Sequence, residues 1–521
     1  MILRLALAVT LALTVFSHAE EIVLAGRAVT RQITGNLTIE GAIKLALQQN
    51  PDILRQLQEI ERTRGLVITA RAAALPHLAL LASYNQESKS FDENRGGSGG
   101  SGSGTNILIP LADGQTLDLS SLFSSSSEAF RASPDKTWQV SLEIRQALYA
   151  GGAIRAGISA AKFGEDIAYW QLRDVIDRVV ATTRGQFYAV LTNRSLIDVA
   201  EETVKLQEDQ LKDQQNRFEA GTVPRFNVIT AEVALANVVP LLIQAKNNYL
   251  ISQIQLAKTL GLDPGPGGEP TFKCVGAITI VERPFDIIQA LELGKARRPS
   301  LKVQRLQIKI QAEQIHIAAA GYKPRINATG GYLFRNSRLT EDIESHVDGW
   351  FIGFTGRWDI FDGLETHGNL KQARAQFEQS QIIYKDSVLQ VELEVQQAFA
   401  NLRSQRETIR SQQKVVEQAV EALRLANERF SAGAGTQLDV LNARTQLTQA
   451  RTTELQSRGN YNITVAEFDR TISADTTYID PFRDPLEKLE QKILGERPVE
   501  EARPNTPMRP ANPGPAKKKK K

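Results

Sequence analysis

The sequence predicts a mainly α-helical protein with a small β part, in which the second half repeats the pattern of the first. Three observations lead to this prediction: a phrase that returns 212 residues later, two very long stretches with helical periodicity, and short alternating segments that carry tryptophan. The phrase RFEAGTVPRFNVITAEVAL begins at Arg217, and its relative RFSAGAGTQLDVLNARTQL begins at Arg429. A repeat on this scale indicates a duplicated half rather than a solenoid of short units.

The repeat extends over two blocks that keep different offsets. Trp138 matches Trp350 at the offset of 212, whereas residues 37–53 match residues 285–301 at an offset of 248. The first copy must therefore contain an insertion between Tyr84 and Trp138. That stretch is rich in glycine and serine, which predicts a flexible loop.

Each copy is predicted to contain one very long helix. Counting in steps of seven from Val388 meets an apolar residue at all seven positions, and counting from Ile176 does so at six of seven. A period of 3.5 sustained over this length indicates coiled-coil packing. The other seam position holds mostly small and amide residues, which favours a hollow barrel of helices over a solid bundle. Gly221 and Gly433 mark the ends of these helices, as glycine does at C-caps.

Alternation with a period of two predicts strands at about 137–149 and 349–361, with weaker examples at about 76–88 and 324–335. Each has about the ten residues that a tilted transmembrane strand needs. Four strands cannot close a barrel, and outer-membrane barrels begin at about eight, so strands that face lipid would require a homo-oligomer. Aromatic residues stand where membrane girdles would lie, namely Trp138, Tyr149, Trp350, Trp358 and Phe361.

The two ends of the chain predict export and a disordered tail. Residues 1–19 carry Arg4, a short apolar run and small residues before Glu20, which is typical of a cleaved signal peptide; a membrane anchor is the alternative. No apolar run of 18 or more residues is expected after residue 20, so no hydrophobic membrane helix is predicted. The proline-rich stretch that ends in Lys517–Lys521 is predicted to be disordered, either as a solvated tail or as a contact for an anionic surface.

These patterns divide the chain into successive regions. They are a signal peptide at 1–19, a linker at 20–36, a first repeat at 37–284, a second repeat at 285–473, a C-terminal segment at 474–495 and the tail at 496–521. Within the repeats, long helices are expected at about 152–219 and 364–431, and return helices at about 225–260 and 437–472.

No pattern of catalytic or metal-binding residues stands out. The net charge of +3 is too small to favour a nucleic-acid partner. Cys274 is the only cysteine, so no disulfide within the chain and no thiolate metal cluster can form. The histidines show no metal-ligand spacing, and the glycine run at 96–104 lacks the Gly-Lys-Ser/Thr of a phosphate loop. We therefore predict no enzyme activity, no cofactor and no metal.

The order of elements resembles the TolC family of outer-membrane efflux proteins. The resemblance rests on two openings similar to LxxxxAIxxALxxNP, on two RFxAG…DVLxA hinges, and on the repeated order of helix, strand, loop, strand, long helix, hinge and helix. It extends from about Leu37 to Ser473. It implies a homotrimer, in which four strands from each chain form a twelve-stranded barrel in the cell outer membrane and twelve helices continue it as a tunnel in the periplasm.

The resemblance also implies a passive role and a set of partners. The protein would be the exit duct of a tripartite efflux or type I secretion system, working with a periplasmic adaptor protein and an inner-membrane transporter and surrounded by outer-membrane lipid. A periplasmic coiled-coil structural protein without a pore is the alternative, and the tryptophan-bearing strands argue against it. The adaptor would dock at the hairpin tips, at Arg217, Gly221, Thr222, Pro224, Arg429, Gly433, Ala434 and Thr436.

The tip of the second hairpin is the position of the gate that the resemblance implies. In well-characterised members, acidic residues form a ring there, and a tyrosine and an arginine hold the gate. Asp439 matches one acidic position, whereas Asn442 stands at the other, and the tyrosine and arginine match Phe430 and Gly435. A weaker ring without those polar links is therefore implied. Asp439 has a second interpretation, since an acid in the first turn of a helix stabilises its N-terminus.

Overall fold

The structure is a computed structural model that describes residues 35–86, 108–110, 116–118, 136–263, 270–280, 286–336 and 346–474. These residues belong to one compact unit that ends at Ala474. The predicted signal peptide, the glycine-rich insertion and the lysine-rich tail lie outside the described residues.

Helices form most of the described chain, and two of them are exceptionally long. Helices α6 and α10 each contain 67 residues, which corresponds to roughly 100 Å at 1.5 Å per residue. The helices are α2 (Ile39–Gln49), α3 (Pro51–Ala72), α6 (Ala153–Glu219), α7 (Arg225–Leu260), α8 (Ile287–Arg297), α9 (Pro299–Ala319), α10 (Glu365–Ser431) and α11 (Gln437–Thr471), with the short 3-10 helix η1 (Ala320–Tyr322).

The strands fall into one sheet of four and two minor pairs. The strands are β1 (Gly35–Leu37), β2 (His77–Gln86), β3 (Leu108–Pro110), β4 (Thr116–Asp118), β5 (Lys136–Ala150), β6 (Phe272–Cys274), β7 (Arg325–Asn336) and β8 (His346–Arg357). The main sheet has the order β2-β5-β7-β8, and β1 pairs with β6. Strand β8 starts and ends earlier than the sequence predicts, so Trp358 and Phe361 lie beyond it.

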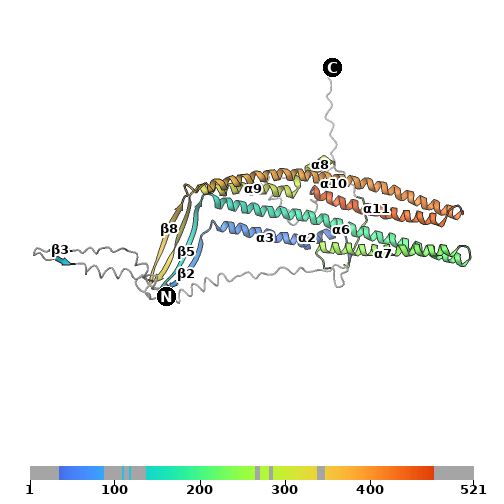
Figure 1. Cartoon of the computed structure of the whole chain (residues 1–521), viewed down its shortest axis with the longest axis horizontal. Helices are drawn as coiled ribbons and strands as arrows, with labels where there is room; N and C mark the ends of the chain where they lie inside the picture. Colours follow the sequence, from blue (N-terminus) through green and yellow to red (C-terminus); the bar gives the residue numbers. More distant parts are fainter. Residues whose placement is uncertain are drawn as a thin grey trace, which may run out of the picture. The chain divides into compact units, whose positions relative to one another are not determined.

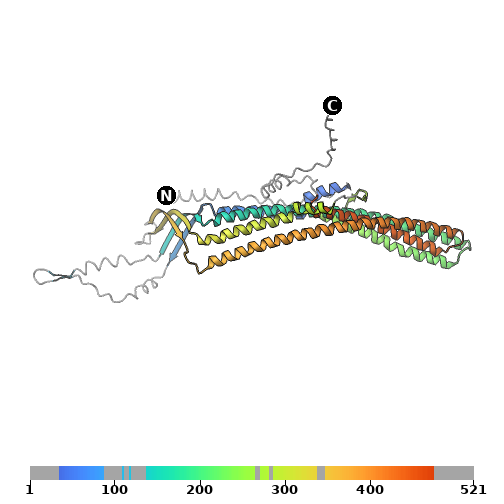
Figure 2. The ribbon, with the colours of Figure 1, turned by 90° about the horizontal axis from the view of Figure 1, so that it is seen from above.

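The helices form a layer in which α6 and α10 run from end to end (Figures 1 and 2). Near the sheet, α6 packs against α3 and α9, and α9 packs against α10. Toward the hairpin turns, α6 packs against α7 and α11, and α11 packs against α10. The layer therefore has the order α3–α6–α9–α10 and then α7–α6–α11–α10. In both parts, α10 forms one lateral edge, and α3 or α7 forms the other.

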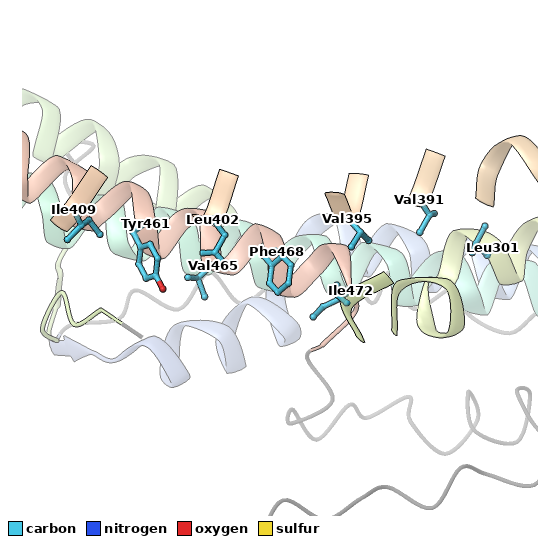
Figure 3. Close-up of a cluster of buried hydrophobic side chains, with 10 residues drawn as sticks. Leu301, Val391, Val395, Leu402, Ile409, Tyr461, Val465, Phe468 and Ile472 are labelled. Atoms are coloured by element: carbon cyan, nitrogen blue, oxygen red, sulfur yellow. The ribbon is translucent and has the colours of Figure 1, made fainter. Parts of the chain in front are cut away.

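The main core of the second half lies between α10 and α11 (Figure 3). The heptad residues Val395, Leu402 and Ile409 of α10 are buried there. They face a row of α11 side chains spaced three or four residues apart, and α9 contributes one leucine. The contacting residues are Leu301, Tyr461, Val465, Phe468 and Ile472. The spacing of both rows is what keeps one face of each helix against the other over several turns.

Candidate functional site

The four-stranded sheet has one apolar face, which its hydrogen-bond register defines. Residues directly opposite each other in an antiparallel pair point to the same side of the sheet. Leu80 pairs with Leu142, Leu142 with Tyr332, and Tyr332 with Trp350. Neighbours two residues away on each strand continue this side, which we call the apolar face: Leu78, Ala82, Tyr84, Trp138, Val140, Ile144, Ile326, Ala328, Phe334, Ile352 and Phe354.

The opposite side, which we call the polar face, carries the other set of alternating residues. Glu143 pairs with Gly331 and Gln139 with Arg335, and Arg325 lies directly opposite Arg357. Arg145 holds Glu143 through two hydrogen bonds of 2.8 Å. A sheet with one mainly apolar face and one face that gathers most of the polar and charged residues is typical of transmembrane β-barrels, which face lipid outside and water inside.

The predicted girdle residues separate into two aromatic bands at opposite ends of the strands. Trp138 and Trp350 lie toward the loop end, whereas Tyr149, Trp358 and Phe361 lie toward the helices. Along β5, Trp138 and Tyr149 are about 35 Å apart at about 3.3 Å per residue. A strand tilt of about 35–45° would reduce this to about 25–29 Å, close to the height of the apolar band of known barrels.

Several aromatic residues of these bands are absent from the sequence prediction. Tyr84 pairs with Trp138, and the ring centroids of Tyr332 and Phe334 are 4.9 Å apart at the loop end. At the helix end, the Trp358 indole Nε1 donates to the Tyr322 carbonyl oxygen over 3.1 Å. The alternation already placed Tyr84 and Tyr332 on one face. Only the register shows that they stand level with the tryptophans.

A β-bulge brings Tyr149 to the apolar face. Ala147 pairs with Asn327 and Tyr149 with Ile326, so that Leu148 between them is left out of the register. Without this extra residue, the alternation along β5 would direct Tyr149 to the polar face. Bulges re-aim side chains in this way at the rims of barrels. The sequence prediction placed Tyr149 in the girdle, but it contained no sign of the bulge that puts it there.

The two hairpin turns close in the same way. Gly221 and Gly433 have φ angles of 71° and 72°, which favour glycine. The backbone N–H groups of Thr222 and Ala434 donate to the carbonyl oxygens of Arg217 and Arg429, over 2.9 and 2.8 Å. These bonds satisfy carbonyls that the helix ends would leave without a partner. The predicted docking residues are thereby gathered on two turns, which lie at the same end of the helical layer (Figures 1 and 2).

The two return helices begin differently. Helix α7 follows Pro224, and no side chain caps its first turn. Helix α11 begins with a capping box, in which the Thr436 hydroxyl accepts from the Asp439 N–H over 3.2 Å and the Asp439 carboxylate accepts from the Thr436 N–H over 2.8 Å. Hydrogen bonds from Thr436, with the nearby positive charge of Arg429, hold the pKa of the Asp439 carboxyl below its usual value. The sequence predicts Asp439 either as a gate residue or as a helix cap. The structure contains the helix cap.

The remaining gate candidates surround this turn. Phe430 is half-buried at the end of α10, and Asn442 is exposed on α11. Gly435 lies against the end of α10, where an added Cβ would be 3.2 Å from the Arg429 Cβ and from the Phe430 backbone nitrogen. This crowding opposes any larger side chain at position 435 in the present turn.

Helix α7 corrects the expectation that no hydrophobic helix follows the signal peptide. Among the described residues, it is the helix whose length and composition would allow it to cross a membrane. Polar residues such as Asn237, and Pro240, interrupt the apolar run in residues 228–245. Glu232 is nevertheless the single charge of this stretch. One side of α7 packs on α6. Its other side leaves large apolar side chains exposed, namely Phe226, Ile229, Val233, Leu241 and Ile243.

Nothing in the described part of the chain gathers three or more histidine, cysteine or acidic side chains in a way that could hold a metal ion. The Cys274 thiol lies on β6, where burial raises its pKa to about 12. The candidate site described by the structure consists of two surfaces: a two-faced sheet at one end of the helices and two closed turns at the other.

This arrangement is that of an outer-membrane protein with a long helical extension, and comparison with known proteins defines its family. Residues 42–262 and 290–472 match the family of outer membrane efflux proteins, and this match covers more than half of the chain. The chain belongs to this family, which includes TolC, and it is an outer-membrane protein with a channel role.

Individual relatives are distant but match over most of their length. The chain is 21% identical to nodulation protein T of Rhizobium leguminosarum bv. trifolii over 416 residues, which are 78% of this chain and 79% of that protein. It is 22% identical to the alkaline protease secretion protein AprF of Pseudomonas aeruginosa, over 78% of each. The fold is similar to that of the Campylobacter jejuni CmeC outer membrane channel, with a TM-score of 0.67, 15% identity, and coverage of 87% and 89%.

Proposed function

We propose that three copies of this chain form a passive exit duct of a tripartite efflux or type I secretion system. Three four-stranded sheets would close a twelve-stranded barrel in the outer membrane, and the helices would continue it as a periplasmic tunnel. The observation that carries the proposal is the sheet itself. It has a lipid-compatible face, a polar face and two edge strands, β2 and β8, that have no partner strand on their outer side among the described residues.

The helical layer supports the same closure. Its lateral edges, α3 or α7 on one side and α10 on the other, follow the two edges of the sheet. An edge strand exposed to lipid leaves backbone groups without hydrogen bonds, at a cost of several kcal/mol for each group. Pairing β2 of one copy with β8 of the next removes that cost. The rotation that relates one copy to the next would also bring α7, with its exposed apolar side chains, against a neighbouring copy.

The gate of the duct is proposed to lie at the two hairpin turns. An adaptor protein would dock on the exposed residues from Arg217 to Pro224 and from Arg429 to Thr436, and an inner-membrane transporter would deliver the cargo. Opening would be a rearrangement of the helix pairs, in the class of helix shifts between packed elements. Energy would come from the transporter.

The test is a disulfide that links neighbouring hairpins, made from Thr222→Cys and Ala434→Cys in a Cys274→Ser background. Oxidation should abolish transport by whole cells and lower single-channel conductance of the purified protein, and reduction should restore both. Unchanged conductance in the oxidised protein would show that the turns are not the gate. The rival, a structural protein without a pore, predicts a soluble, nearly all-helical species and no channels in a bilayer.

A further inference from the structure

The polar face of the sheet carries an excess of positive charge. Its charged strand residues are four arginines and one glutamate, namely Arg145, Arg325, Arg335, Arg357 and Glu143. Arginine stays charged throughout the physiological pH range. Arg145 is neutralised by Glu143, to which it donates two hydrogen bonds. The charge of the other three has no counterpart among the described strand residues of this face.

Two of these arginines occupy an unfavourable position. Arg325 and Arg357 are directly opposite each other across β7 and β8, and like charges in this position destabilise a sheet. The Arg357 side chain donates to Asp359 over 3.0 Å. Within the described residues, the Arg325 side chain has no ion pair or hydrogen bond. The sheet thus retains a like-charge pair that packing and pairing alone would not favour.

The third arginine lies at the other end of the same face. Arg335 pairs in register with Gln139 and Val347 near the loops, and its exposed side chain has no charged partner in the described parts of the chain. Arg325 and Arg335 are the two ends of strand β7 on this face. Any solute that passes along the face therefore meets, at both ends, a guanidinium group that has no ion pair among the described residues.

Acidic residues where the sheet meets α10 offset part of this charge. The Asp362 carboxylate accepts from the backbone N–H groups of Leu364 and Thr366, over 3.0 and 2.8 Å, and so caps α10. Glu365 and Lys323 line the same polar cavity of about 460 Å³ as Arg325 and Arg357. These acidic groups lie after β8 and at the start of α10, and Arg325 and Arg335 remain the two arginines of the polar face that have no ion pair among the described residues.

We propose that the polar face of the sheet makes the pore of this protein prefer anions, with Arg325 and Arg335 as the residues that set this preference. The inference rests on the proposed function, because the polar face lines a water-filled pore only when the sheet closes into a barrel. Fixed charges on the wall of such a pore raise the local concentration of counter-ions, over a Debye length of about 10 Å at 0.1 M salt. Anionic solutes are the substrate class that this wall would admit most readily.

The experiment measures the reversal potential of the purified full-length protein in a planar bilayer under a KCl gradient at low ionic strength. The wild type should favour chloride over potassium. The variants Arg325→Gln and Arg335→Gln should each lower the chloride preference, and the double variant should lower it by about twofold or more. Arg335→Lys keeps the charge and should behave like the wild type. Lys136→Gln is the matched control, since Lys136 lies on β5 at a position of the apolar face.

The outcomes separate the two proposals. If the wild-type protein forms no channels at all, the proposed exit duct fails. If channels form, a shift toward potassium in the glutamine variants, absent in Lys136→Gln, supports the arginine face. Channels whose reversal potential is unchanged in both glutamine variants, or moves toward chloride, overturn it. Oligomers that resist detergent confirm that each variant is folded before its channels are compared.

Discussion

The Arg184 guanidinium donates from Nη1 to the Asp469 Oδ2 over 3.2 Å, which joins α6 to α11 across 285 residues of sequence. The Asp469 side chain is 1% exposed and that of Arg184 16%. Removing one partner of a buried ion pair leaves an uncompensated charge, which costs about 3–5 kcal/mol, whereas replacing both by apolar residues is often neutral. The contact therefore links α6 of the first half to α11 of the second, in addition to the packing between these helices.

We predict that Arg184→Met lowers the thermal stability of the detergent-solubilised protein by an amount equivalent to about 3–5 kcal/mol. Circular dichroism in the far ultraviolet measures this loss. The double variant Arg184→Met/Asp469→Leu should recover most of it, because both charges of the pair are then removed together. Equal loss in the single and double variants would mean that packing volume, rather than charge, determines the effect.

Close packing of the same two helices predicts a second effect. An added Cβ at Gly459 of α11 would lie 2.3 Å from Oγ1 and 3.1 Å from Cβ of Thr192 in α6. Thr192 cannot turn away freely, since its hydroxyl donates to the Tyr188 carbonyl oxygen over 2.8 Å. Gly459→Ala should therefore destabilise the protein by about 1–3 kcal/mol, as overpacking does.

The control for this variant is another glycine within a long helix. An added Cβ at Gly164 of α6 has no neighbour within 4 Å, so Gly164→Ala should stabilise the helix by up to about 1 kcal/mol. Thermal unfolding of both variants measures the difference. A stabilising effect at Gly459 would contradict the close approach of α6 and α11.

Much of this architecture could be predicted from periodic patterns, because each pattern reports one local requirement. The steps of seven that include Val395, Leu402 and Ile409 mark residues that are buried in the structure. Gly221 and Gly433 predict the two turns, since a positive φ angle favours glycine. The alternation that includes Trp138 and Trp350 likewise predicts the strands, although it does not predict their register.

The rest depends on contacts between residues that are far apart in the sequence. The Arg184–Asp469 pair and the fit of Gly459 against Thr192 leave no periodic sign. The bulge at Leu148, which sets the face of Tyr149, is a property of the pairing of β5 with β7. The arginines of the polar face lie in the polar phase of the alternation, whereas the girdle prediction rests on the apolar phase. The opposite phase carries the same information about the inside of a barrel.

The capping box of α11 predicts a difference between the two hairpins. Thr436→Ala removes the hydroxyl that accepts from the Asp439 N–H and should weaken the hairpin by about 1 kcal/mol. The first hairpin has no equivalent side-chain cap, so Pro224→Ala should leave its first helical turn without a comparable loss. Hydrogen exchange of the first-turn amides of α7 and α11 measures both effects. Equal protection in wild type and Thr436→Ala would contradict the prediction.

The same cap predicts a dependence on pH. The folded-state pKa of Asp439 is lowered relative to its usual value of 3.8, because Thr436 donates hydrogen bonds to the carboxylate. Its stabilisation is therefore present above pH 3.8 and disappears as the pH falls through the lower, folded-state value. Asp439→Asn should be less stable than the wild type near neutral pH, and the two should converge in acid. A difference in stability that stays constant with pH would exclude a role for the carboxylate charge.

The two aromatic bands predict which tryptophans contact lipid. Trp350 is 77% exposed and Trp358 61% in the isolated chain, whereas Trp170 is 5% exposed between α6 and α9. In vesicles with brominated phospholipid, the quenched part of the fluorescence should decrease in Trp350→Phe and in Trp358→Phe. Trp170→Phe should remove only unquenched emission. If the quenched part of the fluorescence decreased in Trp170→Phe instead, the membrane would lie at the helices. That result would refute the assignment of the apolar face to lipid.

The single thiol predicts resistance to modification in the native protein. Cys274 pairs with Leu37 between β1 and β6, and burial raises its pKa from 9.0 to about 12. Because the thiolate is the reactive form, a maleimide should label Cys274 slowly at neutral pH and rapidly after unfolding. Cys274→Ser/Ala434→Cys, with its thiol on an exposed turn, is the control that should react at once. The raised pKa also means that folding loses stability as the pH rises from about 9 toward 12. Rapid labelling of native Cys274 would show that β1 and β6 separate readily.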